Sequence, residues 1–444
     1  IKRDGRVVPF DPEKITFAVL RAAVAVGGRD RATAEHITAE VIRLLERRQA
    51  EDRIDNRYPT VEEVQDGVEK VLIEEGHART AKAYIVYRYE HALKRQGRES
   101  LTYSSENIPY RKLWETLDWA VDHGCYSLRQ LREFVADGRF DELVALSEEF
   151  YQKEVDASLD AVKERLDDLR VIIVSGPSSS GKTTTTLKLG EALATHRRRL
   201  VPIAVDNYFF DLETHPTDSH GDYDFETPQA LDLELFNRHL ARLLDGEAVE
   251  IPYYDFKSGR RDGVAEVLQV GPNDIILIDS LHGLYEPMTE SVAAEQKYKL
   301  YIETLAQLKD DENRYIRWTD VRMLRRMVRD MQFRNYNPDQ TLLHWYLVRR
   351  SELRYIVSRL READSIVNSF MPCELPVLKG RLAGRFAEFV ERLEHDEERR
   401  DAYERARRVE ALLHSVPDLP QGGEEAVPGD SLLREFIGGS TYTY

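Results

Sequence analysis

Apolar residues recur along the first hundred positions with the 3.6-residue period of helices. The periodic stretches cover residues 12–26, 31–47, 60–75 and 78–95. Thr60 and Glu63 form the Thr-x-x-Glu pattern of a capping box, which marks the start of the third stretch. A short strand-like segment with a turn at Asp4-Gly5 precedes the helices. We therefore expect residues 1–98 to form a small, mostly helical domain.

From residue 169 onward, short and mainly apolar runs alternate with stretches of helical period. The runs lie at residues 171–174, 200–205, 275–278, 299–302 and 365–368, and the helical stretches at 183–196, 230–244, 321–333 and 341–360. Short apolar runs between helices are typical of parallel strands, because helices cover both faces of a parallel sheet. Residues 169–395 are therefore predicted to form an α/β domain with a mainly parallel sheet covered by helices.

Two further segments complete the predicted organisation. Residues 99–168 are polar and mostly helical, with one charged helix over 147–168, and we interpret them as a helical connector without chemistry of its own. Residues 396–444 are predicted to be a helical extension that includes a Pro/Gly/Glu-rich linker at 417–429. The final stretch, 432–444, regains apolar character, so we expect this tail to dock on another part of the chain.

Composition and charge limit the kinds of partner. The net charge of −17 argues against wide contact with nucleic acid, because acidic surfaces repel phosphates. Cys125 and Cys373 form no CxxC pair, which argues against a zinc ribbon or a disulfide framework. No apolar run approaches the ~18 residues of a membrane-spanning helix, and no signal peptide is visible. We expect a cytoplasmic protein without a membrane or nucleic-acid partner; since the chain starts at Ile1 rather than Met, we also expect a trimmed leader.

A complete phosphate-binding motif follows the apolar run 171–174. Residues 176–183 read Gly-Pro-Ser-Ser-Ser-Gly-Lys-Thr, which is GxxxxGK[ST] between a buried strand and a helix. The glycines let backbone N–H groups turn toward phosphates, and the helix adds its positive end. We expect Lys182 to reach the β- and γ-phosphates and Thr183 to bind Mg²⁺. The predicted nucleotide-binding residues are Gly176, Pro177, Ser178, Ser179, Ser180, Gly181, Lys182, Thr183 and Thr184.

Two carboxylates directly follow predicted strands. Asp206 comes after the run 200–205, and Asp279 follows the four apolar residues 275–278 in a Walker-B-like pattern. Ligands bind beyond the carboxyl ends of strands in such sheets, so both side chains should face the phosphates. Asp206 is predicted to accept the proton of an attacking hydroxyl, and Asp279 is predicted to lie near Mg²⁺.

Three other regions carry candidate residues. The loop 211–227 is rich in Asp, His and Tyr, and the sequence favours an acceptor pocket and a plainly solvated loop about equally. Residues 253–256 offer an aromatic surface for stacking on a flat ring. The helix 320–334 carries arginines at i, i+3, i+4 and i+7, which share one face and would close over the phosphates. These are Arg322, Arg325, Arg326 and Arg329, with Arg334 beyond them.

Residues 169–395 resemble the uridine kinase and phosphoribulokinase family of P-loop kinases. The order and spacing of six segments carry the resemblance: 176–183, 206–209, 223–228, 251–256, 278–285 and 322–334. The closest resemblance is to long bacterial uridine kinase-like nucleoside kinases, which end in a segment like 433–440. The resemblance implies a kinase that uses ATP and Mg²⁺, with a nucleoside as the acceptor.

The resemblance also implies roles for single residues. Asp206 would act as base on a sugar 5′-hydroxyl, an acid at Glu226 would hold the ribose hydroxyls, and Tyr254 would lie against the base. We further expect Tyr208 and Arg322 to contact the substrate, and Lys182, Arg325, Arg329 and Arg334 to act with Asp206 in catalysis.

The chain departs from the uridine kinase pattern at three positions. Uridine kinases carry a base-reading His five residues after the Tyr aligned with Tyr254, where this chain has Gly259. They have Glu at the position of Asp279 and Asp at that of Glu226. We therefore expect the catalytic core to be intact and the choice of base to be looser than in uridine kinases.

Residues 1–95 resemble an ATP-cone, the nucleotide-sensing module of ribonucleotide reductases and their repressor. The matching segments are 2–5, 9–15, 60–66 and 81–88. The resemblance implies that an adenine nucleotide effector contacts Lys2, Arg3, Lys14 and Thr60. It leaves open whether ATP or dATP is the ligand and whether the effect is activation or inhibition.

Two other functions remain open at this point. A kinase of a sugar phosphate or another alcohol would need a basic pocket for the acceptor. A non-catalytic nucleotide-gated regulator would need a surface for nucleic acid or protein. The net charge of −17 argues against a nucleic-acid surface. A homo-oligomer is compatible with the sequence, which does not decide the subunit number.

Overall fold

The computed structural model describes residues 7, 9–26, 28, 30–51, 58–77, 80–81, 84, 107–215, 227–333, 337–382 and 384–443. The chain divides by its internal contacts into two compact units. One unit comprises residues 1–102 and 387–411, and the other comprises residues 103–386 and 412–444. The domain boundaries expected from sequence stay predictions, although the stretch interpreted as a connector groups almost entirely with the second unit.

The first unit contains a small helical core. Its helices are α1 (Glu13–Ala25), α2 (Arg31–Glu51) and α3 (Val61–Glu74), together with most of α13 (Arg385–Leu393) and α14 (Arg400–Ser415). Ile15, Val19, Ile37, Val41 and Leu72 meet in the interior of α1–α3. Thr60 accepts a hydrogen bond from the N–H of Glu63 and the Glu63 carboxylate bonds back, which confirms the predicted capping box.

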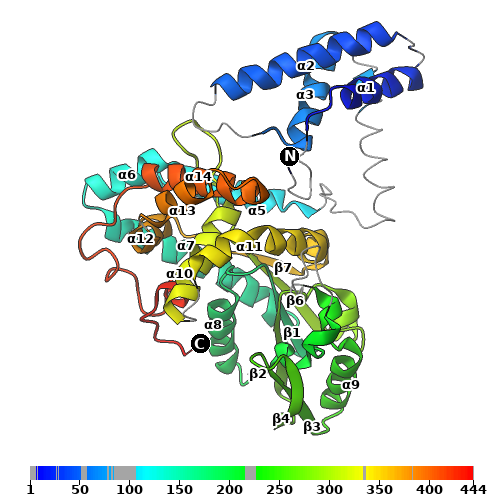
Figure 1. Ribbon diagram of the computed structural model, residues 1–444. Helices are drawn as coiled ribbons and strands as arrows, with labels where there is room; N and C mark the ends of the chain where they lie inside the picture. Colours follow the sequence, from blue (N-terminus) through cyan, green and yellow to red (C-terminus); the bar gives the residue numbers. More distant parts are fainter. Residues whose placement is uncertain are drawn as a thin grey trace. The chain divides into compact units, whose positions relative to one another are not determined.

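The second unit is built on a five-stranded parallel sheet with the strand order β2-β5-β1-β6-β7 (Figure 1). Every pair of neighbouring strands is parallel. The strands are β1 (Val171–Ser175), β2 (Arg199–Ile203), β5 (Asp274–Ser280), β6 (Lys297–Glu303) and β7 (Ser365–Asn368). All five were predicted from their apolar runs, and the α/β class is confirmed.

Helices cover both faces of this sheet. Successive strand residues point to opposite faces, and Val171, Ile173 and Ile276 share a core with Phe236 of α9. Helix α8 packs on β1, β2 and β5, on the side of the sheet away from α9 (Figure 1). The helices of this unit are α5 (Tyr110–Asp122), α6 (Leu128–Ala136), α7 (Phe140–Lys163), α8 (Lys182–Ala194), α9 (Leu233–Leu244), α10 (Trp318–Phe333), α11 (Pro338–Ser351), α12 (Glu374–Leu382) and α15 (Arg434–Ile437).

Three features differ from the expectations. Residues 249–268 form an antiparallel hairpin of β3 (Val249–Asp255) and β4 (Arg260–Leu268), which the sequence pattern did not reveal. The predicted helix 341–360 ends at Ser351 and continues as a π-turn and a 3₁₀ turn. The predicted helix 147–168 begins earlier, at Phe140, because Phe140, Leu143 and Val144 extend its buried face.

The remaining expectations concern cysteines and membranes. Cys125 and Cys373 are both buried and unbonded, as expected, and burial raises the pKa of Cys125 to about 12. Among the helices in the described ranges, none combines the length and the apolar character needed to span a membrane.

Candidate active site

The phosphate loop leaves the centre of the sheet, directly after β1. Gly176 has no room for a side chain, because a Cβ there would collide with the carbonyl oxygen of Ile302 in β6. Gly181 has a φ of 88° and stands at the N-terminus of α8, so it also requires glycine. Ser179, with a φ of 60°, adopts a strained backbone conformation of the kind found at ligand-binding loops. Residues 176–183 thus have the backbone shape of a phosphate cradle.

Lys182 and Thr183 begin α8 and lie at the edge of this cradle. The Lys182 ammonium spans the loop and donates hydrogen bonds to the carbonyl oxygens of Gly176 and Pro177, at 3.1 and 3.3 Å. Thr183 is half-buried. The hydroxyls of Ser179 and Ser180 are buried without a partner in the described structure, which indicates that the loop has polar capacity left for a ligand.

Two carboxylates lie at the same edge of the sheet as the loop. Strand register pairs Val174 of β1 with Asp279 of β5, and β2 leads through a 3₁₀ turn to Asp206. Desolvation raises the pKa of Asp279 to about 6, and the charge of Lys182 partly opposes this rise. The negative charges of Glu435 and Asp206 raise the pKa of Asp279 further. The structure therefore brings Lys182, Asp206 and Asp279 together, as the sequence predicted.

The β3–β4 hairpin is fixed to the Asp206 turn. The Tyr254 backbone N–H donates a 3.1 Å hydrogen bond to the side-chain oxygen of Asn207. The Tyr254 ring packs against Phe209 and Phe256, with centroids 5.5 and 5.0 Å away. Its hydroxyl is buried and makes no hydrogen bond in the described structure. The Tyr254 side chain is almost completely buried beside the predicted base, whereas its neighbour Phe256 is exposed, so contact of Tyr254 with a ligand stays a prediction.

Tyr208 requires a correction. We expected it to contact substrate, but its side chain is fully buried. Its hydroxyl shares a 2.9 Å hydrogen bond with His239, and its ring meets Phe236 edge-on. Tyr208 anchors the Asp206 turn to α9 instead, because its side chain lies on the buried side of the turn.

Gly259 closes the turn between β3 and β4. Its φ is 68°, and a Cβ added there would lie 2.7 Å from the Cβ of Leu212. A histidine at this position would therefore be strained and would collide with Leu212. The conformation of this hairpin therefore requires glycine at position 259.

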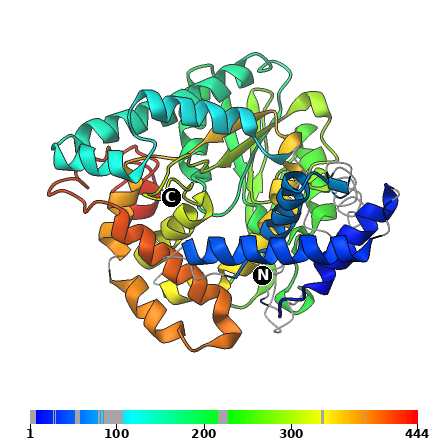
Figure 2. The same ribbon diagram turned by 90° about the horizontal axis from the view of Figure 1, so that it is seen from above.

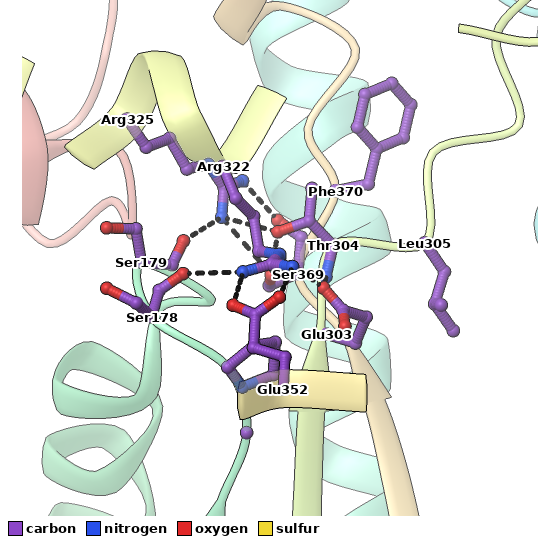
Figure 3. Close-up of polar contacts among 12 residues, drawn as sticks. Ser178, Ser179, Glu303, Thr304, Leu305, Arg322, Arg325, Glu352, Ser369 and Phe370 are labelled. Atoms are coloured by element: carbon purple, nitrogen blue, oxygen red, sulfur yellow. Dashed lines mark hydrogen bonds and ion pairs between the residues drawn. The ribbon is translucent and has the colours of Figure 1, made fainter. Parts of the chain in front are cut away.

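Two of the α10 arginines, Arg322 and Arg325, are not part of an open lid (Figure 3). Arg322 and Arg325 are fully buried. Arg322 pairs with Glu303 at 2.7 Å and Glu352 at 2.6 Å, and Arg325 pairs with Glu374 at 2.5 Å. Each also donates to the phosphate loop, Arg322 to the carbonyl oxygen of Ser178 and Arg325 to that of Ser179. The expected contacts of Arg322 with substrate and of Arg325 with phosphate are corrected: buried carboxylates already compensate both charges, and both guanidinium groups hold the backbone of the loop.

The other arginines of this helix are placed differently. Arg326 donates a 3.3 Å hydrogen bond to the Ser178 hydroxyl, and Arg329 pairs with Asp330 at 3.3 Å. Both are partly exposed, and the role of Arg329 in catalysis stays a prediction. Arg334 lies outside the described residues, as does Glu226 with most of its loop.

Two residues at the site were missed by the sequence analysis. His282 follows Asp279 by three residues, is buried, and leaves both ring nitrogens without a partner within the described ranges. Desolvation and the charge of Lys182 lower its pKa to about 3, so the imidazole is neutral. Glu435, from the far end of the sequence, bonds to Thr184 in the first turn of α8. A histidine just after a strand-end acid was a usable signal, whereas nothing local pointed to Glu435.

The regulatory residues belong to the first unit. Lys2 and Arg3 lie outside the described residues. Lys14 is exposed and pairs with Asp11 at 3.3 Å, and the Thr60 side chain caps α3. Contact of these residues with a nucleotide stays a prediction.

The residues present fit a magnesium nucleotide. Mg²⁺ takes oxygen ligands, usually one or two from the protein, with phosphates and water completing its shell. The Thr183 hydroxyl and the Asp279 carboxylate supply such oxygens, and within the described residues no cluster of three His, Cys, Asp or Glu suggests another metal. Thr183 and Asp279 would hold the ion, and the loop N–H groups would hold the phosphates.

Comparisons with known proteins agree with this arrangement. Residues 171–375 match the phosphoribulokinase / uridine kinase family, and residues 1–93 match the ATP cone domain. A uridine kinase from Brevibacillus brevis is 30% identical over 198 residues, which are 44% of this chain and 83% of that protein. A uridine kinase from Deinococcus deserti is 29% identical over 199 residues, 44% of this chain and 86% of that protein.

Among solved structures, D-glycerate 3-kinase from Cryptococcus neoformans matches 49% of this chain and 91% of its own chain. The identity is 13% and the TM-score is 0.30, so this likeness supports no further conclusion.

Proposed function

This chain belongs to the phosphoribulokinase and uridine kinase family, and we propose that it transfers the γ-phosphate of ATP to the hydroxyl of a nucleoside. One observation carries the proposal. A complete phosphate loop, Asp206 and Asp279 converge at one edge of the parallel sheet, beside an aromatic wall. This is the set of groups that phosphoryl transfer to an alcohol requires.

On the donor side, the loop N–H groups and Lys182 would hold the phosphates of ATP. Mg²⁺ bound by Thr183 and Asp279 would neutralise charge on the β- and γ-phosphates. The oxygen of the acceptor hydroxyl would bond to the γ-phosphorus while the bond between the γ-phosphorus and the β–γ bridging oxygen breaks. Asp206 would accept the proton that the hydroxyl loses. ADP leaves with the bridging oxygen.

On the acceptor side, the Tyr254 ring and its aromatic neighbours favour a flat ligand. The Tyr254 hydroxyl is buried without a hydrogen bond in the described structure, so a ligand would reach it only after the residues that cover it move. Because Gly259 has no side chain and no space for one, the hairpin turn does not read the base. We propose an acceptor nucleoside with loose base choice, held at its ribose by Glu226.

A sugar phosphate acceptor is less well supported. The arginines at the start of β4 are already paired, Arg260 with Glu213 at 3.4 Å and Arg261 with Asp232 at 3.0 Å. An acceptor phosphate would have to compete with these carboxylates.

The N-terminal domain is proposed to bind an adenine nucleotide and to adjust the kinase, since residues 1–93 match the ATP cone domain. Regulation requires different nucleotide affinity in two states of the protein, and a coupling of about 1–3 kcal/mol would change activity roughly 5- to 150-fold. Deletion of residues 1–98 should abolish the response to ATP or dATP beyond substrate use while basal turnover remains. A full effector response in the truncated protein would place the sensor elsewhere.

The decisive experiment is a screen of ribo- and deoxyribonucleosides for acceptor-dependent ADP release. We expect several nucleosides to be phosphorylated, with modest preference among bases. Turnover only with non-nucleoside alcohols would contradict the acceptor class. Nucleotide binding without turnover on any acceptor would favour the non-catalytic regulator.

A further inference from the structure

The segment 424–443 folds back onto the phosphate loop. Its residues Ser431, Leu432, Leu433, Phe436 and Ile437 are almost completely buried, although the segment begins as a polar linker in the sequence. In Figures 1 and 2 this red stretch lies beside α10, and α15 within it packs on α10. The predicted docking of the tail is therefore observed, at the nucleotide site itself.

Glu435 is the centre of this contact. One of its carboxylate oxygens accepts two hydrogen bonds from Thr184: one from the backbone N–H at 3.1 Å and one from the hydroxyl at 2.8 Å. Thr184 is the third residue of α8, and its N–H is one of the orphan donors at the helix N-terminus. These donors, aimed outward at the positive end of the helix, are what a phosphate loop offers to the phosphates of a nucleotide.

Neighbouring side chains hold Glu435 in this place. Leu432 covers Gly181 so closely that a Cβ on the glycine would collide with it. The Phe436 ring lies against the Arg325 guanidinium, 5.1 Å from its centroid. Flanking this core, Lys188 of α8 pairs with Asp430 at 3.2 Å.

Other negative charges lie near Glu435. Glu435 and Asp206 both raise the pKa of Asp279, so these three carboxylates interact at this edge. Glu148 of α7 is hydrogen-bonded to Ser431 of the segment. A nucleotide phosphate placed on Thr184 would meet Glu435 at the same donors and add further negative charge.

We propose that the segment 424–443 is a built-in competitor of the nucleotide, in which the Glu435 carboxylate takes the place of a phosphate group on Thr184. Binding of the nucleotide then requires Glu435 to leave, so the segment sets the apparent affinity of the site. When only a fraction of the molecules can bind the ligand, the apparent dissociation constant is the intrinsic constant divided by that fraction. The inference rests on nucleotide binding at the phosphate loop, as does the proposed function.

The test compares Glu435→Gln with Glu425→Gln in the full chain. Gln keeps the size of Glu435 but removes the charge that strengthens both hydrogen bonds. Glu425 is an exposed carboxylate of the same segment and serves as the matched control. Hydrogen exchange of the amides of residues 176–186 is followed during a titration with Mg²⁺ and ADP, because these amides report the phosphate loop separately from the N-terminal domain.

We expect the ADP concentration for half-protection to fall about 10-fold in Glu435→Gln and to stay unchanged in Glu425→Gln. In the unmodified chain, amides of residues 431–438 should exchange faster when ADP is added. This second measurement needs no variant and stands even where Glu435→Gln folds poorly.

Equal ADP affinity in all three proteins, or protection of residues 431–438 by ADP, would overturn the competitor role while leaving the proposed function intact. Absence of any ADP protection at residues 176–186, in the variant as well, would overturn both.

Discussion

Arg322 and Glu352 form a fully buried ion pair, 2.6 Å between Nη1 and Oε1, from which the same guanidinium nitrogen donates to the carbonyl oxygen of Ser178 in the phosphate loop. A residue expected to meet the substrate is therefore buried and holds the backbone of the phosphate loop instead. A buried pair stabilises little by itself, but loss of one partner leaves an uncompensated charge.

Arg322→Met should consequently destabilise the fold by about 3–5 kcal/mol, because Glu303 loses its buried partner and Glu352 keeps only Arg349. Urea unfolding of the variant measures this change. The partly exposed pair of Arg359 and Glu362 provides the control, since Arg359→Met should cost about 1 kcal/mol or less. Equal losses in the free energy of unfolding for the two variants would contradict the buried ion pairs described for Arg322.

Asp206→Asn should lower kcat about 10²- to 10⁴-fold on the acceptor identified by the screen, because the amide cannot take the hydroxyl proton. The affinity for ATP should change little, since the loop N–H groups and Lys182, rather than Asp206, are expected to hold the phosphates. Lys182→Ala is the companion variant and should also lose turnover, because the lysine that is expected to hold the phosphates of ATP is gone. If Asp206→Asn keeps normal turnover and Glu226→Gln abolishes it, the base lies in the 211–227 loop.

Gly259→His should not create preference for uridine. The backbone at 259 is left-handed, and Leu212 fills the space that a side chain would need. We expect the thermal unfolding midpoint to fall, because the hairpin must distort, and the ratio of kcat/KM values for uridine and other nucleosides to stay within about threefold. A double variant with Leu212→Ala separates the two causes, since it removes the collision and leaves the strain. Selective uridine phosphorylation by Gly259→His alone would contradict the geometry.

His282 predicts a loss of stability in acid. Its pKa is lowered from 6.5 to about 3 in the folded protein, so the unfolded chain binds a proton that the folded protein does not. The contribution of His282 to the free energy of unfolding is then fully present above pH 6.5 and is lost as the pH drops toward 3. The loss between pH 7 and 5 is about 2 kcal/mol. His282→Leu should remove this part of the acid sensitivity, whereas His395→Leu, at an exposed histidine, should retain it. Parallel pH curves for wild type and His282→Leu would show that the imidazole is not kept neutral by burial.

The sequence by itself determined the features that depend on neighbouring residues. The apolar runs located all five parallel strands, since strands covered on both faces are mostly apolar. The GxxxxGK[ST] motif located the phosphate loop, because its backbone shape depends on glycines at fixed spacing. Asp206 and Asp279 were located for the same reason: each lies close to the carboxyl end of its own strand.

Only the tertiary structure decided what depends on partners far away in the sequence. The arginine face of α10 was correctly recognised as a helix face, but the carboxylates that neutralise Arg322 and Arg325 stand 30 and 49 positions away. Glu435 meets Thr184 across 251 positions, and no local pattern encodes that meeting. Burial of a charge depends on which distant side chains compensate it, and that is settled only when helices and strands pack together.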